Sequence, residues 1–225
     1  MKKFKHEKID IGYDDLDTTT TNSGRDYLTP DGSLYPSVTT VLSILNEDII
    51  KAWRQRVGEE EANRISGKAS NRGTRVHSIV EKYLNNEDTV KFLPHIRQSL
   101  ENLKPVLNDI ETIYGLEVPL YSHYLGLAGR CDCIGKYKGV PSIIDFKTSR
   151  YIKKKEKISN YFAQGAAYSI MLEERVGLIA PNIVIIMDVD HEKPVVFVEH
   201  RDNYTKLLHD TIDEYRKRRM FGHCS

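Results

Sequence analysis

The stretch Ser142-Ile143-Ile144-Asp145-Phe146-Lys147-Thr148 places two opposite charges inside an apolar run that is typical of a buried strand. Alternate side chains of a strand share a face, so Asp145 and Lys147 point the same way and the apolar residues beside them pack. The Asp145 carboxylate and the Phe146 backbone carbonyl can bind a hard divalent cation, with the Lys147 ammonium beside it. The alternative is a strand end with an ion pair and no metal, since buried charges need partners in any protein.

Two predicted strands precede this stretch. Residues 116–121 and 125–135 are alternately apolar and polar or continuously apolar, and each range lies between turn residues. Together with residues 141–148 they predict three antiparallel strands. Asp132 then lies on the strand next to that of Asp145. The two carboxylates can therefore meet at one cation.

The remaining elements follow from the spacing of apolar residues and from turn signals. Pro30-Asp31-Gly32 is a turn signal, which predicts a hairpin over residues 25–35. Thr74 is expected to cap a helix that begins there. Helices are predicted at 37–45, 48–66, 74–85, 93–112, 158–177 and 201–219, and further strands at 181–187 and 194–198.

Length and composition predict one domain with a polar extension. The chain has 225 residues, of which 40% are hydrophobic, enough for one sizeable core. We expect an N-terminal arm and hairpin over 1–35 and a single domain over 36–225, with a helical part at 36–112 and a sheet core and C-terminal helix at 113–225. The net charge of +1 gives no global attraction to nucleic acid, so any such affinity must come from local patches.

The predicted helix 74–85 can bring a further metal ligand to the sheet. His77 and Glu81 lie at i and i+4 and therefore share a face of this helix. A lone helical histidine is more often structural. We therefore expect His77 to bind a metal only together with the acidic residues of the strands, and Glu81 to have a supporting role at that site.

Several polar and aromatic residues are placed to hold nucleic acid beside this cation. Hydrolysis of a phosphodiester needs a metal, an attacking water, a stabiliser of developing charge and a grip on the strand. Gln164 and Tyr168 lie at i and i+4 on a helix and can reach the strand end where Lys147 lies. The hydroxyls of Ser37 and Thr39 can hold a phosphate at a helix start, or only cap it. The candidate nucleic-acid contacts are Gln164, Tyr168, Tyr151, Lys153, Lys154, Ser37, Thr39 and Arg72.

Four motifs follow one another along the chain. They are Gly-Thr-x-x-His-x-x-x-Glu at 73–81, Gly-x-x-Gly-Arg-x-Asp at 126–132, Ile-Ile-Asp-Phe-Lys-Thr at 143–148 and Gln-x-x-x-Tyr at 164–168. Together they resemble the RecB-type branch of the PD-(D/E)xK nuclease superfamily. Within that branch, residues 35–42 and Trp53 resemble mitochondrial genome maintenance exonucleases and stand-alone phage exonucleases.

The resemblance implies an α+β fold with an α/β/α restriction-endonuclease-like core. A central mixed β-sheet of about five strands would be flanked by helices, with an N-terminal helical extension. The implied activity is that of a Mg²⁺- or Mn²⁺-dependent exonuclease that degrades DNA from free ends and prefers single strands, in replication, recombination or repair. The implied partners are DNA and replication or recombination proteins.

The resemblance also implies roles for individual residues. His77, Asp132 and Asp145 match the metal ligands of the family, and Lys147 matches its catalytic lysine. Gln164 and Tyr168 match its substrate-side motif, while Glu117 occupies the place of a supporting acid on the strand before.

Two alternatives stay open. The enzyme can instead be a double-strand 5′ to 3′ exonuclease or a flap endonuclease, or the chain can be a non-catalytic nucleic-acid-binding subunit. Three cysteines, Cys131, Cys133 and Cys224, are too few for a four-cysteine iron–sulfur cluster, so none is expected. Alternation with Asp132 predicts that the first two are core residues.

The expected location is the cytoplasm, or the host cytoplasm if the source is viral. No apolar run is long enough to cross a bilayer, so no membrane partner is expected. The start of the chain lacks the apolar core of a signal peptide and a long Arg- and Ser-rich leader.

Overall fold

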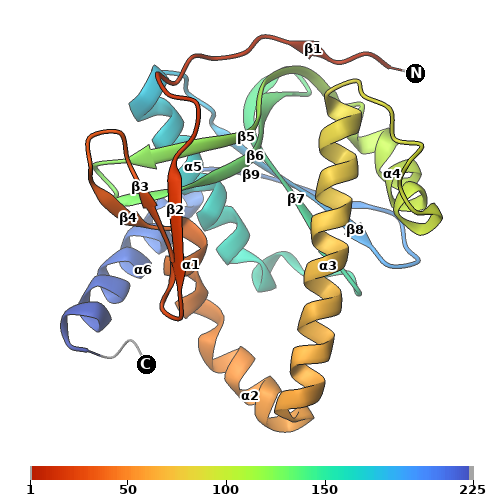
Figure 1. The fold of residues 1–225 in the computed structure, drawn as a ribbon. Helices are drawn as coiled ribbons and strands as arrows, with labels where there is room; N and C mark the ends of the chain where they lie inside the picture. The colour runs from red at the N-terminus through yellow and green to blue at the C-terminus, as the bar shows by residue number, and fades with distance from the viewer. Residues whose placement is uncertain (1, 223–225) are drawn as a thin grey trace.

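A six-stranded mixed sheet forms the centre of the computed structural model, which describes residues 2–222 (Figure 1). The strand order is β1-β5-β6-β7-β8-β9, one strand more than expected. The strands are β1 Lys5–His6, β5 Ile110–Ser122, β6 Leu127–Tyr137, β7 Val140–Ser149, β8 Asn182–Val189 and β9 Val195–His200. The pairs β5–β6, β6–β7 and β8–β9 are antiparallel, and β1–β5 and β7–β8 are parallel. The predicted α+β class with a restriction-endonuclease-like core is therefore confirmed.

Helices cover both faces of the sheet (Figure 1). Helices α3 and α4 pack on one face, and α1, α5 and α6 pack on the other. The helical segments are α1 Val38–Leu42, η1 Ser43–Asn46, α2 Glu47–Val57, α3 Glu59–Leu84, α4 Pro94–Leu107, η2 Lys155–Lys157, α5 Ser159–Val176 and α6 Asp202–Met220. The predicted helices 158–177 and 201–219 and the strands beside them are confirmed to within a few residues. In the part of the chain that the structure describes, no helix is long and apolar enough to cross a membrane.

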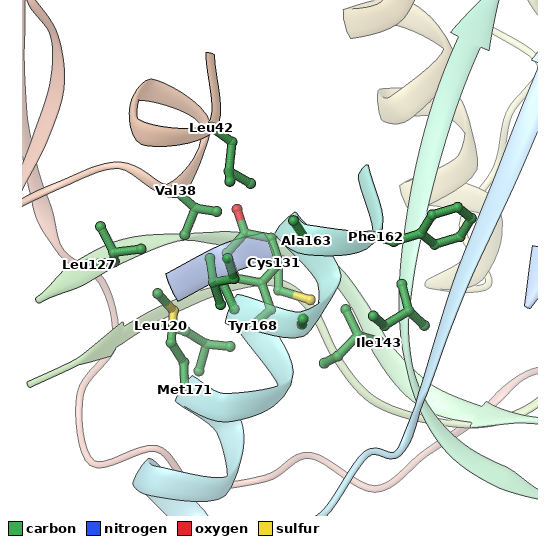
Figure 2. Close-up of a cluster of buried hydrophobic side chains, with 14 of the residues drawn as sticks. Val38, Leu42, Leu120, Leu127, Cys131, Ile143, Phe162, Ala163, Tyr168 and Met171 are labelled. Atoms are coloured by element: carbon green, nitrogen blue, oxygen red, sulfur yellow. The ribbon is translucent and has the colours of Figure 1, made fainter. Parts of the chain in front are cut away.

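The core on the α5 face joins the sheet to three helices. Figure 2 shows side chains from α1, the sheet and α5 meeting in one cluster. Helix α5 is buried on most sides because Gly165 and three alanines let it lie close to the strands. Ala163, Ala166 and Ala167 have no exposed surface. The close approach fixes the part of α5 that carries Gln164.

The core on the α3 face fixes the second half of that helix. Val76, Ile79, Val80, Tyr83 and Leu84 recur at helical spacing and are at most 2% exposed. They pack against α4 and against strand residues that include Ile144 and Phe146. His77 lies within this anchored half of α3.

The N-terminal arm and hairpin are more ordered than expected. Strands β2 Asp17–Thr21, β3 Gly24–Leu28 and β4 Leu34–Pro36 form a small antiparallel sheet, which confirms the predicted hairpin and adds a strand to it. β1 pairs with β5, so the arm crosses one edge of the main sheet. Leu16 and Tyr27 are buried against Tyr121 and Ala128.

The helix boundaries between residues 47 and 112 differ from the prediction, and residues 110–112, predicted as the end of a helix, begin β5. The break falls at Gly58, whose φ of 86° ends α2, and α3 runs without interruption through Gly67 and Gly73. Thr74 is therefore not a cap, and its hydroxyl donates to the Ser70 carbonyl one turn earlier at 3.1 Å. The prediction that a helix begins at Thr74 is wrong, because Arg72 pairs with Asp188 of β8 and anchors this stretch of the helix.

Helix α2 and the first half of α3 project from the body of the molecule (Figure 1). Between residues 47 and 75 the only buried residue is Ala62. Ile49 and Ile50 of α2 are 67% and 48% exposed. These two helical segments lie beside the end of β7, where Gly73 approaches Thr148.

Candidate active site

Three acidic residues lie in one row across the centre of the sheet. Cys133 has a ladder partner on each neighbouring strand, Leu116 of β5 and Ile144 of β7. The next positions along the three strands are therefore opposite one another. They are Glu117, Asp132 and Asp145.

The β6–β7 ladder ends at this row. The pairing of β6 with β7 begins beyond Asp132, and the Asp132 carboxylate takes the place of a backbone acceptor. Its Oδ2 accepts a hydrogen bond of 2.9 Å from the Phe146 amide. The Phe146 ring is buried and meets the His77 ring edge to face, with centroids 6.3 Å apart. The two strands thus separate where the acids lie, which leaves room for a ligand.

His77, Glu117 and Asp132 form a group that can hold a metal ion. One ligand atom from each lies within 4.8 Å of the others, and all three side chains are partly exposed. His77 Nδ1 is 3.6 Å from Asp132 Oδ2. The structure therefore brings the predicted ligands His77 and Asp132 together. Glu117, whose role was open from the sequence, lies beside them.

The backbone at Glu117 has an unusual conformation. Its φ is 50°, in the left-handed region that non-glycine residues seldom adopt, next to an irregularity in the β5–β6 ladder. Arg130 donates from Nη1 to the Glu117 carbonyl at 2.8 Å and forms an ion pair with Asp15 of the arm. Arg130 therefore holds the bend that turns the Glu117 carboxylate toward Asp132.

Burial, together with the charges of Asp132 and Glu81, raises the pKa of Glu117 to about 7. A carboxyl group that resists ionisation here would be stabilised as an anion by a bound cation. Glu81, the predicted supporting acid, lies one turn of α3 beyond His77. It acts on the site through its charge.

Asp145 and Lys147 form a buried pair. Lys147 Nζ lies 2.6 Å from Asp145 Oδ1 and 2.5 Å from Oδ2, and the Asp145 side chain is 3% exposed. Burial raises the pKa of Asp145 to about 6, although the Lys147 charge opposes the rise. Burial disfavours the Lys147 ammonium, but the charges of Asp145 and Asp132 outweigh it and raise its pKa. Lys147 is thus a fixed cation beside the row of acids.

Helix α5 contributes Gln164 from the opposite face. Its Oε1 lies 3.5 Å from Lys147 Nζ, as the sequence predicted. Tyr168 is only 3% exposed and packs in the core (Figure 2), where its ring lies over Gly129. The expected contact of Tyr168 with nucleic acid is therefore corrected to a supporting role, because the ring faces the sheet.

Aromatic and basic residues continue from Lys147 toward the surface. Tyr161 lies under two ammonium groups, with Lys147 Nζ 5.2 Å and Lys153 Nζ 5.1 Å from its ring centroid. Lys153 also donates to the Tyr161 hydroxyl at 2.8 Å. Tyr151 is 73% exposed, and Lys154 is exposed beside it. The predicted nucleic-acid contacts Tyr151, Lys153 and Lys154 therefore lie on one accessible stretch.

A cavity of about 460 Å³ opens between the first half of α3 and the end of β7. Arg72, at its wall, was expected to contact nucleic acid. It is not free to do so, because it pairs with Asp188 at 2.6 Å and Asp190 at 2.9 Å. Sequence reasoning missed three of the basic lining residues. Two of them precede Arg72 at steps of four residues, a spacing that predicts one basic helix face. The five basic lining residues are Arg64, Lys68, Arg72, Arg150 and Lys153.

Two further expectations concern polar residues outside this group. Ser37 is 2% exposed, and its hydroxyl accepts from the Thr40 amide at 3.0 Å, so the cap alternative holds and a phosphate contact does not. Thr39 is exposed next to it, 3.1 Å from the Ser37 hydroxyl. Cys131 and Cys133 are fully buried. Cys224 lies outside the described residues.

The donor set fits a hard divalent cation. Carboxylate oxygens and an imidazole nitrogen suit Mg²⁺ or Mn²⁺, with the oxygens dominant. Asp145 Oδ2 is buried and shares the Lys147 ammonium with Oδ1, and a carboxylate oxygen that accepts from one ammonium retains a lone pair for a cation. Burial raises the pKa of the thiols of Cys131 and Cys133, which disfavours thiolate ligation.

Comparisons with known proteins point to exonucleases. No family model matches the chain. Over 128 residues the chain is 28% identical to mitochondrial genome maintenance exonuclease 1 of Homo sapiens, which covers 52% of this chain and 37% of that protein. It is 25% identical over 137 residues to the Mus musculus protein of the same name, covering 56% of this chain and 40% of that protein. The chain thus spans about two fifths of the length of these curated relatives.

A solved structure, a "Putative exonuclease" from Eubacterium rectale, matches with a TM-score of 0.46 and 18% identity, over 69% of this chain and 70% of that chain. The chain is therefore similar in sequence to two proteins named as exonucleases.

Proposed function

We propose that this chain is a metal-dependent DNA exonuclease that uses Mg²⁺ or Mn²⁺ and acts in replication, recombination or repair. The observation that carries the proposal is the row of Glu117, Asp132 and Asp145, flanked by His77 on one side and by the partly buried Lys147 on the other. Phosphodiester hydrolysis needs a cation and a fixed positive charge at one place. The sequence similarity to named exonucleases supports the same chemistry.

His77, Glu117 and Asp132 would hold the cation, with Asp145 and the Phe146 carbonyl as the further predicted ligands. A cation bound there supplies a Lewis acid for the phosphoryl oxygen and lowers the pKa of a bound water. In the metal-free chain, burial raises the pKa values of Glu117 and Asp145 to about 7 and about 6, and a bound cation would lower both because it stabilises the carboxylates.

Lys147 would stabilise the charge that develops on the phosphoryl oxygens. Its ammonium is held by Asp145 and lies within reach of Gln164, so its position is fixed before substrate binds. A charge that is already oriented costs no reorganisation in the transition state. Lys147 is therefore the residue that we assign to transition-state stabilisation.

The residues that would hold the DNA strand lie beyond Lys147, toward the surface. The basic cavity, the rings of Tyr151 and Tyr161 and the ammonium of Lys153 form a surface with both charge and stacking faces. Such surfaces hold single strands, because exposed bases can stack on aromatic rings. The projecting helices α2 and α3 beside this surface support a preference for single strands, since they narrow the approach to the acids.

A panel of labelled DNA substrates tests this function. Linear and circular DNA, each single- and double-stranded, are incubated with Mg²⁺, Mn²⁺ or EDTA. We expect release of nucleotides from linear single strands with either metal and none with EDTA. Cleavage of circles would show an endonuclease, and preference for linear duplexes would show a double-strand exonuclease. Metal-independent binding of DNA without turnover would identify a non-catalytic subunit.

A further inference from the structure

A second cavity, of about 860 Å³, lies on the other side of the metal-binding group. The N-terminal arm covers it, and its walls come from the arm, the end of α3 and the bulged part of β5. Glu117 lines this cavity and also belongs to the group with His77 and Asp132. The cavity therefore shares one wall residue, Glu117, with the group that would hold the cation.

Helix α3 contributes residues to the basic cavity, the metal-binding group and the second cavity, in that order along its axis. Arg72 lines the basic cavity, His77 belongs to the metal-binding group, and Glu81 lines the second cavity. At 1.5 Å per residue, His77 lies about 7.5 Å beyond Arg72 along the axis, and Glu81 about 6 Å beyond His77. Along the axis of α3, the metal-binding group therefore lies between the two cavities.

The arm that roofs the second cavity is attached at both ends. The amides of Glu7 and Ile9 donate to β5 at 2.9 and 3.0 Å. The Tyr13 hydroxyl donates to the Pro119 carbonyl at 3.1 Å, and Asp15 pairs with Arg130. The cavity is therefore a built part of the fold.

The linings of the two cavities differ in charge. The first carries five Lys or Arg side chains and one acid, Asp190. The second carries one lysine, Lys8, against four acids, and the half-buried rings of Tyr13 and Tyr114. The charge of the first lining favours phosphate groups although Arg72 is paired, the charge of the second disfavours them, and the second offers aromatic walls to bases and sugars.

We propose that the arm-covered cavity receives the nucleotides cut from the strand and that its acidic lining speeds their release. This rests on the proposed function and names a product site for it. A cavity of this size lies within the range of small-molecule sites, which suits a mononucleotide or dinucleotide. The aromatic walls would hold base and sugar, and the acids would weaken retention of the phosphate.

Asp14 provides the test, because it is exposed, lines the cavity, and forms no hydrogen bond or ion pair in the part of the chain that the structure describes. Asp14→Lys reverses one charge of the lining. Asp17→Lys, an equally exposed change on β2, is the matched control. The probe is a 5′-phosphorylated thymidine dinucleotide, used as an inhibitor of DNA hydrolysis and as a ligand in equilibrium binding.

We expect Asp14→Lys to bind the dinucleotide about fivefold more tightly than wild type, with Asp14→Asn between them and Asp17→Lys unchanged. Single-turnover cleavage should stay the same in all four proteins, and a thermal melt verifies their folding. Equal dinucleotide affinity in Asp14→Lys and Asp17→Lys overturns the product site. A wild type that never hydrolyses DNA overturns the proposed function instead, and the binding measurement still tests the cavity.

Discussion

Lys147 and Asp145 neutralise one another inside the sheet, with Nζ 2.6 Å from Oδ1, at a position where the carboxylate is almost fully buried. A charge removed from water is tolerated only when its partner is present. The pair therefore couples the catalytic chemistry that we propose to the stability of the fold.

Lys147→Met removes the ammonium and keeps the apolar stem. At pH 8 it leaves Asp145 as an unpaired buried anion, so we expect a loss of about 3 kcal/mol in the free energy of unfolding. Without the Lys147 charge the pKa of Asp145 rises above its value of about 6 in the wild type, so the loss should shrink as pH falls from 8 to 6 and Asp145 becomes protonated. Lys147→Arg keeps the charge and should keep most of the stability, but it should lose DNA hydrolysis, since the guanidinium places its charge differently. Urea unfolding at two pH values measures the effect. Equal stability of Lys147→Met and wild type at pH 8 would argue against a charged pair.

Glu117→Gln tests the acid for which the family resemblance implies only a supporting role. The amide keeps the size of the side chain but is a weaker metal ligand, so the Mn²⁺ concentration for half-maximal activity should rise about tenfold. Glu81→Gln is the control, since Glu81 contributes charge from a greater distance and should have a smaller effect. Titration of Mn²⁺ in the hydrolysis assay gives both values. A larger effect for Glu81→Gln would reverse the assignment.

The pH dependence of stability in EDTA also depends on Glu117. Its pKa is about 7 in the folded chain, above the ordinary value of 4.5 that it has in the unfolded chain, so the folded state binds the proton more tightly. The free energy of unfolding should therefore fall as pH rises from about 4.5 to about 7. In Glu117→Gln this part of the slope should be absent. Addition of Mg²⁺ should reduce the slope in wild type only. Identical slopes in both proteins would contradict the raised pKa.

Gly129→Ala tests the contact between β6 and α5. A Cβ at Gly129 would lie 2.9 Å from the Tyr168 ring, and Tyr168 is buried and cannot move freely. We expect a loss of about 1–3 kcal/mol in the free energy of unfolding. Gly67→Ala is the control, because its Cβ meets nothing within 4 Å in the middle of α3, where alanine favours the helix. No destabilisation by Gly129→Ala would show that the ring does not lie over the glycine.

Much of the sheet could be predicted because local patterns determine it. Strands β5 to β9 are apolar runs between turn residues, and Cys131 and Cys133 of β6 are buried as predicted. The two cysteines pack in different core clusters on opposite faces of the sheet, so the predicted alternation with Asp132 is interrupted there. The pairing of β1 with β5 could not be predicted, because a two-residue strand has no periodicity and its partner is more than 100 residues away.

The helix break illustrates a second limit. Glycine weakens a helix by about 1 kcal/mol, which made Gly67 to Gly73 a reasonable place for a break. The ion pairs from Arg72 to Asp188 and Asp190 connect segments more than 100 residues apart and hold the helix continuous there. Likewise, the role of Glu117 depends on ladder register and on the Arg130 contact to its carbonyl. Neither appears in a local pattern.

The most direct measurement is the Mg²⁺-dependent release of nucleotides from linear single-stranded DNA by wild type and by Asp132→Asn. Asp132 lies at the centre of the row and contacts both the Phe146 amide and His77, so its charge is needed for the cation. We predict hydrolysis by wild type and a loss of at least about 100-fold in the variant, with the fold intact by thermal melt. Undiminished hydrolysis by Asp132→Asn would contradict the assignment of this row as the active site.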